Sequence, residues 1–304
     1  MRSILNQDFA DFELLLVDDG SDDDSLELMC SLAQVDSRIV VLHQDHAGVS
    51  VARNYALDKA VGQYVCFVDA DDYVAPSYLS SLYAHKDCDM VVSGYVVDEE
   101  TCDGNCLRAS VQSLPQSGRI RISSGCDPIY PLFKDGRMHA CWNKKMKNDI
   151  IRKHAIRFPS ICINEDYIFV VNYLVYAKEV YAEQSANYHW VRVNGRSSGV
   201  DSLPSNLLEI YLDACEYTKK IFRMHELVDK FFYFSYEFVA RKYMIARRQG
   251  VISSKHCRKL LHEMFAAPAV LNSFRLHHPK SLGAAIQHYL LRFKLFSIYE
   301  KVFL

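Results

Sequence analysis

The sequence has 304 residues, of which 50% are hydrophobic and 24% are charged, as in ordinary globular proteins. This length is enough for one large domain with a smaller appendage, or for two modest domains. No uninterrupted apolar run approaches the roughly 20 residues of a membrane-spanning helix, and the first residues lack the apolar segment of a signal peptide. We therefore expect neither a spanning helix nor a secretory signal.

The net charge of −2 is unevenly distributed along the chain. Residues 1–104 hold 21 Asp and Glu against 5 Lys and Arg, whereas the remainder holds 16 against 30. This distribution argues against a nucleic-acid binder; the acidic part is suited to a metal ion and the basic part to phosphates or a membrane surface. The ten cysteines include no CxxC pair, which favours free thiols in a reducing cytosol over disulfides or a zinc site.

Apolar runs and helical patterns alternate over the first hundred residues. Strands are expected at 12–17, 38–42, 64–68 and 89–97, and helices at 21–33, 50–60 and 76–85. Residues 98–125 are polar and are expected to form a loop, while helical spacing prevails beyond Asn206. The alternation predicts an α/β fold with a mostly parallel sheet, in which ligands lie beyond the carboxyl ends of the strands.

Two acidic clusters directly follow predicted strands. Asp19 ends the first strand, where a carboxylate can accept from a nucleobase N–H or a ribose hydroxyl, although Asp-Gly-Ser is also an ordinary turn. Asp69, Asp71 and Asp72 end the run at 64–68. Crowded carboxylates repel one another and favour a divalent cation such as Mg²⁺ or Mn²⁺, the alternative being an acidic surface loop.

Three further motifs carry polar residues, each with a structural alternative. Arg53 lies one turn into a predicted helix, where it can reach a diphosphate or remain a surface residue. Glu165 and Asp166 precede an apolar helical run, either as general-base candidates or as acids favoured by the helix dipole. His189 and Arg192 can meet phosphate charge or be, respectively, a satisfied hydrogen-bonding residue and a solvated cation.

Together and in this order, the motifs resemble those of the inverting family-2 glycosyltransferases of GT-A fold, especially bacterial enzymes of surface polysaccharide assembly. The resemblance covers about residues 2–200 and rests on the segments ILNQDFADFELLLVDDGSDD, HAGVSVARNYAL, GQYVCFVDADDYV, CWNKKM, INEDYIFV and YHWVRVNGRSS. It implies a GT-A domain that transfers sugar from a nucleotide-sugar, of UDP type, to a hydroxyl acceptor. It also implies a divalent metal cofactor, Mn²⁺ or Mg²⁺, and a place in exopolysaccharide or capsule biosynthesis.

On the donor side, the resemblance implies a role for each matching residue. Asp19 would contact the nucleobase, and Asp69 would lie near the ribose. Asp71 would bind the metal that bridges the diphosphate. The remaining residues expected to hold the nucleotide-sugar are Arg53, His189 and Arg192.

On the acceptor side, the resemblance implies a second group of residues. Asp166 would be the general base that deprotonates the acceptor hydroxyl, and Glu165 would position it. Trp142, Asn143 and Lys144 match a Trp-Asn-Lys element near the acceptor. The acceptor itself would be a saccharide or a lipid-linked saccharide.

The sequence departs from the family at its start, because Met1 stands inside the helix that follows the family's first strand. A strand and part of a helix are therefore expected to be missing, through a misassigned start, decay of the gene, or a chain that really folds this way. The alternatives to an active transferase are an inactive remnant that serves as a binding or scaffold protein, and a nucleotidyltransferase.

Residues 1–204 are expected to form the GT-A domain, and residues 205–304 a helical region. Within this region, residues 284–304 interleave large apolar and basic side chains, a pattern that suits a helix lying on an anionic membrane or packing on the catalytic domain. We expect a cytoplasmic protein, peripheral to the inner face of the cell membrane, with no nucleic-acid partner.

Overall fold

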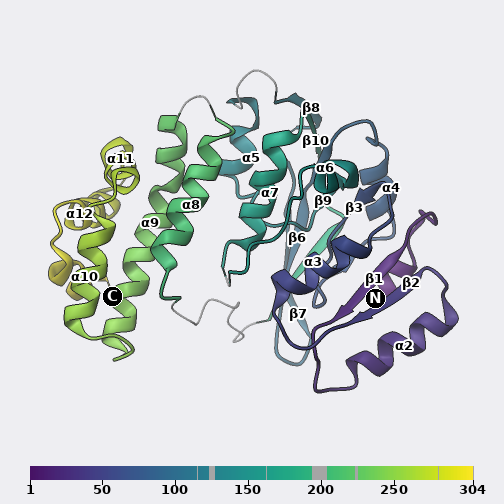
Figure 1. Cartoon of the computed structure of the whole chain (residues 1–304). Helices are drawn as coiled ribbons and strands as arrows, with labels where there is room; N and C mark the ends of the chain where they lie inside the picture. The colour runs from purple at the N-terminus through teal and green to yellow at the C-terminus, as the bar shows by residue number, and fades with distance from the viewer. Residues whose placement is uncertain are drawn as a thin grey trace. The chain divides into compact units, whose positions relative to one another are not determined.

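The computed structural model describes residues 1–114, 116–122, 127–161, 163–193, 204–222, 225–279 and 281–303. The chain folds into two compact units (Figure 1). The first unit comprises Met1–Ile161 and Glu165–Ser197 and contains all of the described strands. The second comprises Cys162–Asn164 and Ser198–Leu304, and its described elements are helices.

The first unit alternates strands and helices along its first part, as expected from the sequence. Its strands are β1 (Leu14–Asp18), β2 (Ile39–His43), β3 (Tyr64–Val65), β4 (Tyr73–Val74), β5 (Met90–Ser93), β6 (Tyr95–Glu100), β7 (Cys106–Gln112), β8 (Gly118–Arg121), β9 (Lys144–Lys147), β10 (Glu179–Glu183) and β11 (Tyr188–Val193). Its helices are α1 (Arg2–Leu5), α2 (Ser25–Val35), α3 (Val49–Lys59), α4 (Tyr78–Tyr83), the 3-10 helix η1 (Asp127–Ile129), α5 (Tyr130–Lys134), α6 (Asn148–Lys153) and α7 (Glu165–Tyr176).

Three sheets organise these strands. β1 and β2 form a parallel pair, against which α2 and α3 pack. A five-stranded sheet has the order β3-β9-β5-β10-β8, and a four-stranded sheet the order β4-β11-β6-β7. Of the eight pairings among the described strands, three are parallel and five antiparallel. The α/β class is therefore as expected, but its sheets are mixed rather than mostly parallel.

The expectation of a loop over residues 98–125 is wrong, because this region carries strands. β6 runs on to Glu100, and β7 returns beside it in an antiparallel hairpin with an irregularity between Glu99 and Glu100. β7 is largely exposed, so its sequence lacks the alternation of buried and polar residues that marks a half-buried strand. Its backbone hydrogen bonds to β6, rather than burial of side chains, define it as a strand.

The core of the first unit fixes the ends of several elements. β5 lies between β9 and β10, and all four of its residues are buried. α7 is buried around most of its circumference. Phe169 on this helix packs its ring on Phe158, with centroids 4.0 Å apart, and on Phe67, at 5.7 Å. Because Phe67 stands two residues before Asp69, this packing ties the start of α7 to the acidic loop that follows β3.

The second unit confirms the expected helical C-terminal region. Its helices are α8 (Leu207–Lys219), α9 (His225–Arg248), α10 (Ser254–Met264), α11 (Pro268–Leu276), α12 (Leu282–Arg292) and α13 (Phe296–Phe303). α9 is contacted by α8, α10 and α11, and α12 by α13 (Figure 1). Among the described residues, none of the helices has both the length and the apolar character needed to cross a bilayer.

Candidate functional site

Asp19, the first residue after β1, organises the loop between β2 and α3. Its carboxylate accepts from the Gln44 side chain at 2.7 Å and from the backbone N–H groups of Ala47 and Gly48 at 2.9 and 2.8 Å. Burial opposes ionisation, but these hydrogen bonds prevail and lower the pKa of Asp19. Gly20 has a φ of +71°, and a Cβ there would stand 2.8 Å from the backbone nitrogen of His46. Asp19 thus closes the loop that leads into α3.

Arg53 is the centre of the strongest polar cluster. It stands on α3, and its guanidinium lies 2.8 Å from Asp69 Oδ1, 3.3 Å from Glu165 Oε1 and 2.5 Å from Asp166 Oδ1. The Arg53 side chain is only 15% exposed, and its guanidinium also faces the ring of Phe158, at 5.3 Å. The structure therefore brings together one arginine and three carboxylates that come from three separate sequence motifs.

The charges of this cluster do not balance, since three carboxylates face one guanidinium. Burial raises the pKa of Asp69; Arg53 counteracts the rise, while the charges of Asp166 and Asp71 add to it. Burial also raises the pKa of Glu165, with Asp166 contributing in the same direction. For Arg53, burial alone would lower the pKa, but the surrounding negative charge more than offsets it. The site is therefore suited to receive a further cation.

Asp166 is held in a fixed orientation. Besides the contact between its Oδ1 and Arg53, its Oδ2 accepts from the backbone N–H of Cys141 at 3.2 Å. Asp166 and Glu165 form the first turn of α7, where the helix dipole favours acidic side chains. The two interpretations of this motif, acids favoured by the helix dipole and general-base candidates, are therefore compatible, because both acids start a helix and also enter a buried polar cluster.

The three aspartates after β3 have different surroundings. Asp69 binds Arg53 with its carboxylate, whereas Asp71 is exposed and makes no hydrogen bond or ion pair with the described residues. Asp72 is buried and accepts from the Tyr188 hydroxyl at 2.6 Å and from the Val191 N–H at 2.9 Å. Burial raises the pKa of Asp72 to about 6. Asp72 therefore attaches the acidic loop to β11 and leaves Asp71 to face solvent.

Asp71 and Asp69 are the residues that fit a divalent metal. In the described part of the chain, no group of three or more His, Cys, Asp or Glu side chains is arranged to hold an ion. A Mg²⁺-type ion that arrives with a diphosphate, however, needs only one or two protein carboxylates, since phosphate oxygens and water supply the other ligands. The exposed carboxylate of Asp71, next to the negatively charged cluster, meets that requirement.

Asn143 and Lys144, expected on the acceptor side, are fully buried. The Lys144 ammonium donates to the backbone oxygens of Arg137 and Ala140, both at 2.6 Å, and to Asn143 Oδ1 at 2.8 Å. Asn143 has a φ of +50° and donates to the Ser93 carbonyl oxygen at 2.7 Å. These two residues therefore act inside the fold, and any effect on an acceptor passes through the loop that they hold.

Trp142 lies in a half-buried aromatic cluster. Its ring stacks on Tyr188 with centroids 4.6 Å apart and meets Tyr95 edge-on at 4.9 Å. Trp190 lies 6.0 Å away. Because Tyr188 also binds Asp72, this cluster connects the Trp-Asn-Lys element to the acidic loop.

His189 takes part in a network that the sequence did not reveal. Its Nδ1 lies 2.7 Å from Oδ2 of the buried Asp98, which also accepts from the Tyr73 hydroxyl at 2.7 Å. The rings of His189 and Tyr73 stack with centroids 4.3 Å apart. Arg192 is exposed, and its guanidinium lies 5.3 Å from the Trp190 ring. Asp98 directly follows the strand predicted at 89–97 and belongs to β6, but it falls within the loop predicted from residue 98 onward.

Comparison with known proteins agrees with this architecture. Residues 1–125 match the family model described as Glycosyl transferase family 2. EpsH of Bacillus subtilis (strain 168) is 27% identical over 199 residues, which cover 62% of this chain and 55% of EpsH. The uncharacterised glycosyltransferase YibD of Escherichia coli (strain K12) is 31% identical over 194 residues, covering 61% of this chain and 54% of YibD. The chain thus spans about half the length of these curated relatives.

A solved structure matches over nearly the whole chain. The crystal structure of S. aureus TarS 1–349 in complex with UDP-GlcNAc superimposes with a TM-score of 0.67 at 18% identity, covering 99% of this chain and 84% of that one. At this identity the likeness shows the fold, which is GT-A. The fold predicted from the sequence is therefore confirmed, and the match of residues 1–125 to the Glycosyl transferase family 2 model agrees with the predicted resemblance.

Proposed function

We propose that this protein is an inverting glycosyltransferase that moves a sugar from a nucleotide-sugar, of UDP type, to a hydroxyl acceptor. The observation that carries the proposal is the joint binding of Asp69 and Asp166 by Arg53. Inverting transfer needs a general base on the acceptor and stabilisation of the leaving diphosphate, close together. Asp166 is suited to the first task and the loop of Asp69 and Asp71 to the second.

Asp166 is the proposed general base. Arg53 and the Cys141 N–H each engage one of its oxygens, which fixes the orientation of the carboxylate. Each carboxylate oxygen has a further lone pair that can accept the proton of an acceptor hydroxyl. Glu165, on the same guanidinium, is the proposed positioning residue of this pair.

Asp71 is the proposed metal ligand, with Asp69 beside it, and Mn²⁺ or Mg²⁺ is the proposed ion. When bound, such an ion neutralises negative charge on the leaving diphosphate. The unbalanced carboxylates around Arg53 favour a cation at this place. Arg53 itself is committed to three carboxylates, so we assign it an indirect role in donor binding, through Asp69.

The remaining donor contacts are assigned to residues of the first unit outside the Arg53 cluster. Asp19 is the proposed nucleobase partner, although its oxygens already accept from the loop that it closes. His189 and Arg192 on β11 are the proposed diphosphate partners. Trp142, on the aromatic cluster, remains the proposed acceptor-side residue.

We further propose that the catalytic site is contained in residues 1–204, that residues 205–304 form a separate helical region, and that the protein acts in the cytoplasm in the assembly of a cell-surface polysaccharide. The matches to EpsH and YibD, both named as glycosyltransferases of bacteria, support the bacterial transferase part of this proposal. Cys88, Cys141 and Cys215 are buried free thiols, as is usual in a reducing compartment.

Calorimetric titration of UDP, with and without Mn²⁺, tests the donor and metal assignments. The full chain should bind UDP more tightly with the ion, and Asp71→Asn should remove that difference. Asp103→Asn, at another exposed aspartate of the same unit, should leave it unchanged. Failure of UDP to bind the full chain under either condition would reject the UDP-type donor, and an unchanged effect of Mn²⁺ in Asp71→Asn would reject the metal ligand.

A further inference from the structure

Large exposed apolar side chains gather on the last two helices. Among the described residues, 21 large apolar side chains are exposed, and seven of them stand on or between α12 and α13. We call these seven the apolar stripe: Leu282, Ile286, Tyr289, Phe293, Leu295, Ile298 and Val302. Single exposed apolar residues are normal on a protein surface, but a contiguous set marks an interaction site.

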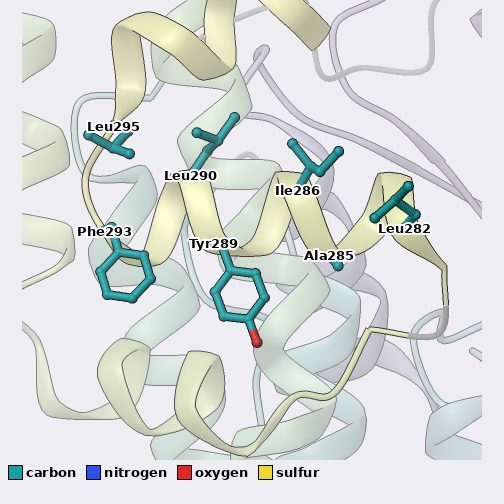
Figure 2. A pocket seen from close by; sticks show the side chains of 7 residues that line it. All are labelled: Leu282, Ala285, Ile286, Tyr289, Leu290, Phe293 and Leu295. Carbon is teal, nitrogen blue, oxygen red and sulfur yellow. The ribbon is translucent and has the colours of Figure 1, made fainter.

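The stripe follows from the helical period. Leu282, Ile286, Tyr289 and Phe293 are spaced by four, three and four residues and thus share one face of α12, while His288 is buried. Figure 2 shows these side chains along the helix, around a groove of about 350 Å³ that Ala285, Leu290 and Leu295 complete. The groove is open and lined by apolar side chains. On α13, Phe296 and Tyr299 are buried, and Ile298 and Val302 are exposed.

Basic side chains accompany the stripe. Arg292, Lys294 and Lys301 are exposed within or beside it. Residues 268–304 hold five Lys and Arg and a single acidic residue, Glu300. This charge complements an anionic surface, whereas a second copy of the same face would bring like charges together. The combination of an apolar face, aromatic rings and flanking cations is that of a helix in the interface of an anionic bilayer.

We propose that α12 and α13 dock the protein on an anionic lipid bilayer. The apolar stripe enters the boundary between headgroups and acyl chains, and Arg292, Lys294 and Lys301 contact the phosphates of the headgroups. This surface lies in the second unit and needs no donor, so the inference goes beyond the proposed transferase activity and stands independently of it.

Vesicle co-sedimentation of the full chain tests the proposal. The probes are vesicles of phosphatidylcholine alone and of phosphatidylcholine mixed with phosphatidylglycerol. The protein should bind the anionic vesicles and be released as the salt concentration rises from about 0.15 M to about 1 M, because salt screens the basic contacts. Absence of binding to the anionic vesicles, or equal binding to both kinds, would overturn the proposal.

Two double variants separate the apolar and basic contributions. Ile286→Glu with Phe293→Glu should lower the partition coefficient at least about 100-fold, since two apolar side chains that would enter the bilayer are replaced by carboxylates. The matched control is Phe234→Glu on α9, because Phe234 is 65% exposed and Phe293 63%, and it should bind like the wild-type chain. Arg292→Gln with Lys294→Gln should lower binding to the anionic vesicles about 30-fold.

The glutamine pair changes only exposed polar side chains, so it keeps the test decisive even if the glutamate pair fails to fold. Wild-type binding by either double variant would overturn the docking surface. Sedimentation analysis in solution tests whether a second copy of the chain, rather than a bilayer, binds this face. A dimer of the full chain that the glutamate pair dissociates would assign the face to a second copy and overturn the proposal.

Discussion

Asp69 and Asp166 bind the two terminal nitrogens of one guanidinium, with Arg53 Nη2 2.8 Å from Asp69 Oδ1 and Nη1 2.5 Å from Asp166 Oδ1. One aspartate follows a strand, and the other starts a helix almost a hundred residues later. A planar, forked cation can hold two carboxylates at a set separation. Arg53 therefore helps to set the distance between the acidic loop of Asp69 and the proposed base Asp166, together with the aromatic packing that ties α7 to this loop.

Replacing Arg53 should change both stability and rate. Arg53→Gln leaves three half-buried carboxylates without their cation, and the free energy of unfolding should fall by about 2–4 kcal/mol. Arg53→Lys keeps the charge but loses the fork, so kcat should fall about 100-fold with a smaller loss of stability. Denaturant unfolding and steady-state rates measure the two effects.

The matched control for Arg53 is Arg157, whose ion pair with Asp58 is far more exposed. Arg157→Gln should cost less than about 1 kcal/mol and leave kcat unchanged. Equal losses of stability for Arg53→Gln and Arg157→Gln would show that the buried cluster contributes no more to the free energy of unfolding than an exposed ion pair does.

Asp166→Asn should separate binding from chemistry. The amide has nearly the same shape as the carboxylate but cannot take the proton of an acceptor hydroxyl, so kcat should fall by about 100- to 10,000-fold. Affinity for UDP, measured by calorimetry, should remain close to that of the wild-type chain. Asp149→Asn at the start of α6 is the control, because that acid is also in the first turn of a helix but is exposed. A wild-type rate for Asp166→Asn would remove Asp166 as the base.

The order of the elements and the acidic loops at Asp19 and Asp69 could be predicted from the sequence, because apolar runs that end in acids are a local signal. The three motifs that carry Arg53, Asp69 and the pair of Glu165 and Asp166 are each ambiguous alone. Arg53 contacts Glu165 and Asp166 although more than a hundred residues separate them in the sequence, and neither composition nor periodicity can predict such a contact. Only the order of motifs shared with a known family placed them in one site.

The misses have a similar cause. β7 has exposed side chains and is held by backbone hydrogen bonds, so its sequence reads as a polar loop. Asp98 falls within that predicted loop, although its carboxylate forms hydrogen bonds with both Tyr73 and His189. The place of Lys144 near the acceptor is implied by the family resemblance and stays a prediction. Its sequence did not indicate burial, because lysines are normally exposed, but its three hydrogen bonds allow it to be buried.

Lys144 should give the stability a measurable dependence on pH. Burial lowers the pKa of Lys144 from 10.5 to about 7 in the folded chain. Between these two values the unfolded chain binds more protons than the folded one, so the free energy of unfolding rises with pH across this window. In Lys144→Met this rise should be smaller, whatever the variant's absolute stability. Unfolding curves from about pH 7 to pH 10.5 measure the slope.

Lys59→Met is the control for this slope, since Lys59 is exposed near the end of α3. Its slope should equal that of the wild-type chain. Identical slopes in Lys144→Met and the wild-type chain would mean that Lys144 keeps its proton throughout the window and would contradict the prediction.

Gly20→Ala should destabilise the first unit by about 1–3 kcal/mol, because its φ of +71° disfavours any side chain and the new Cβ would stand 2.8 Å from the His46 backbone nitrogen. The backbone cannot move aside without opening the loop that Asp19 holds, so affinity for UDP should fall as well. Gly118→Ala in β8 is the control, since a Cβ there meets no atom within 4 Å. Thermal unfolding should show a lower Tm for Gly20→Ala and an unchanged or higher one for Gly118→Ala. If both variants unfold like the wild-type chain, the loop between β1 and α2 is not constrained by this contact.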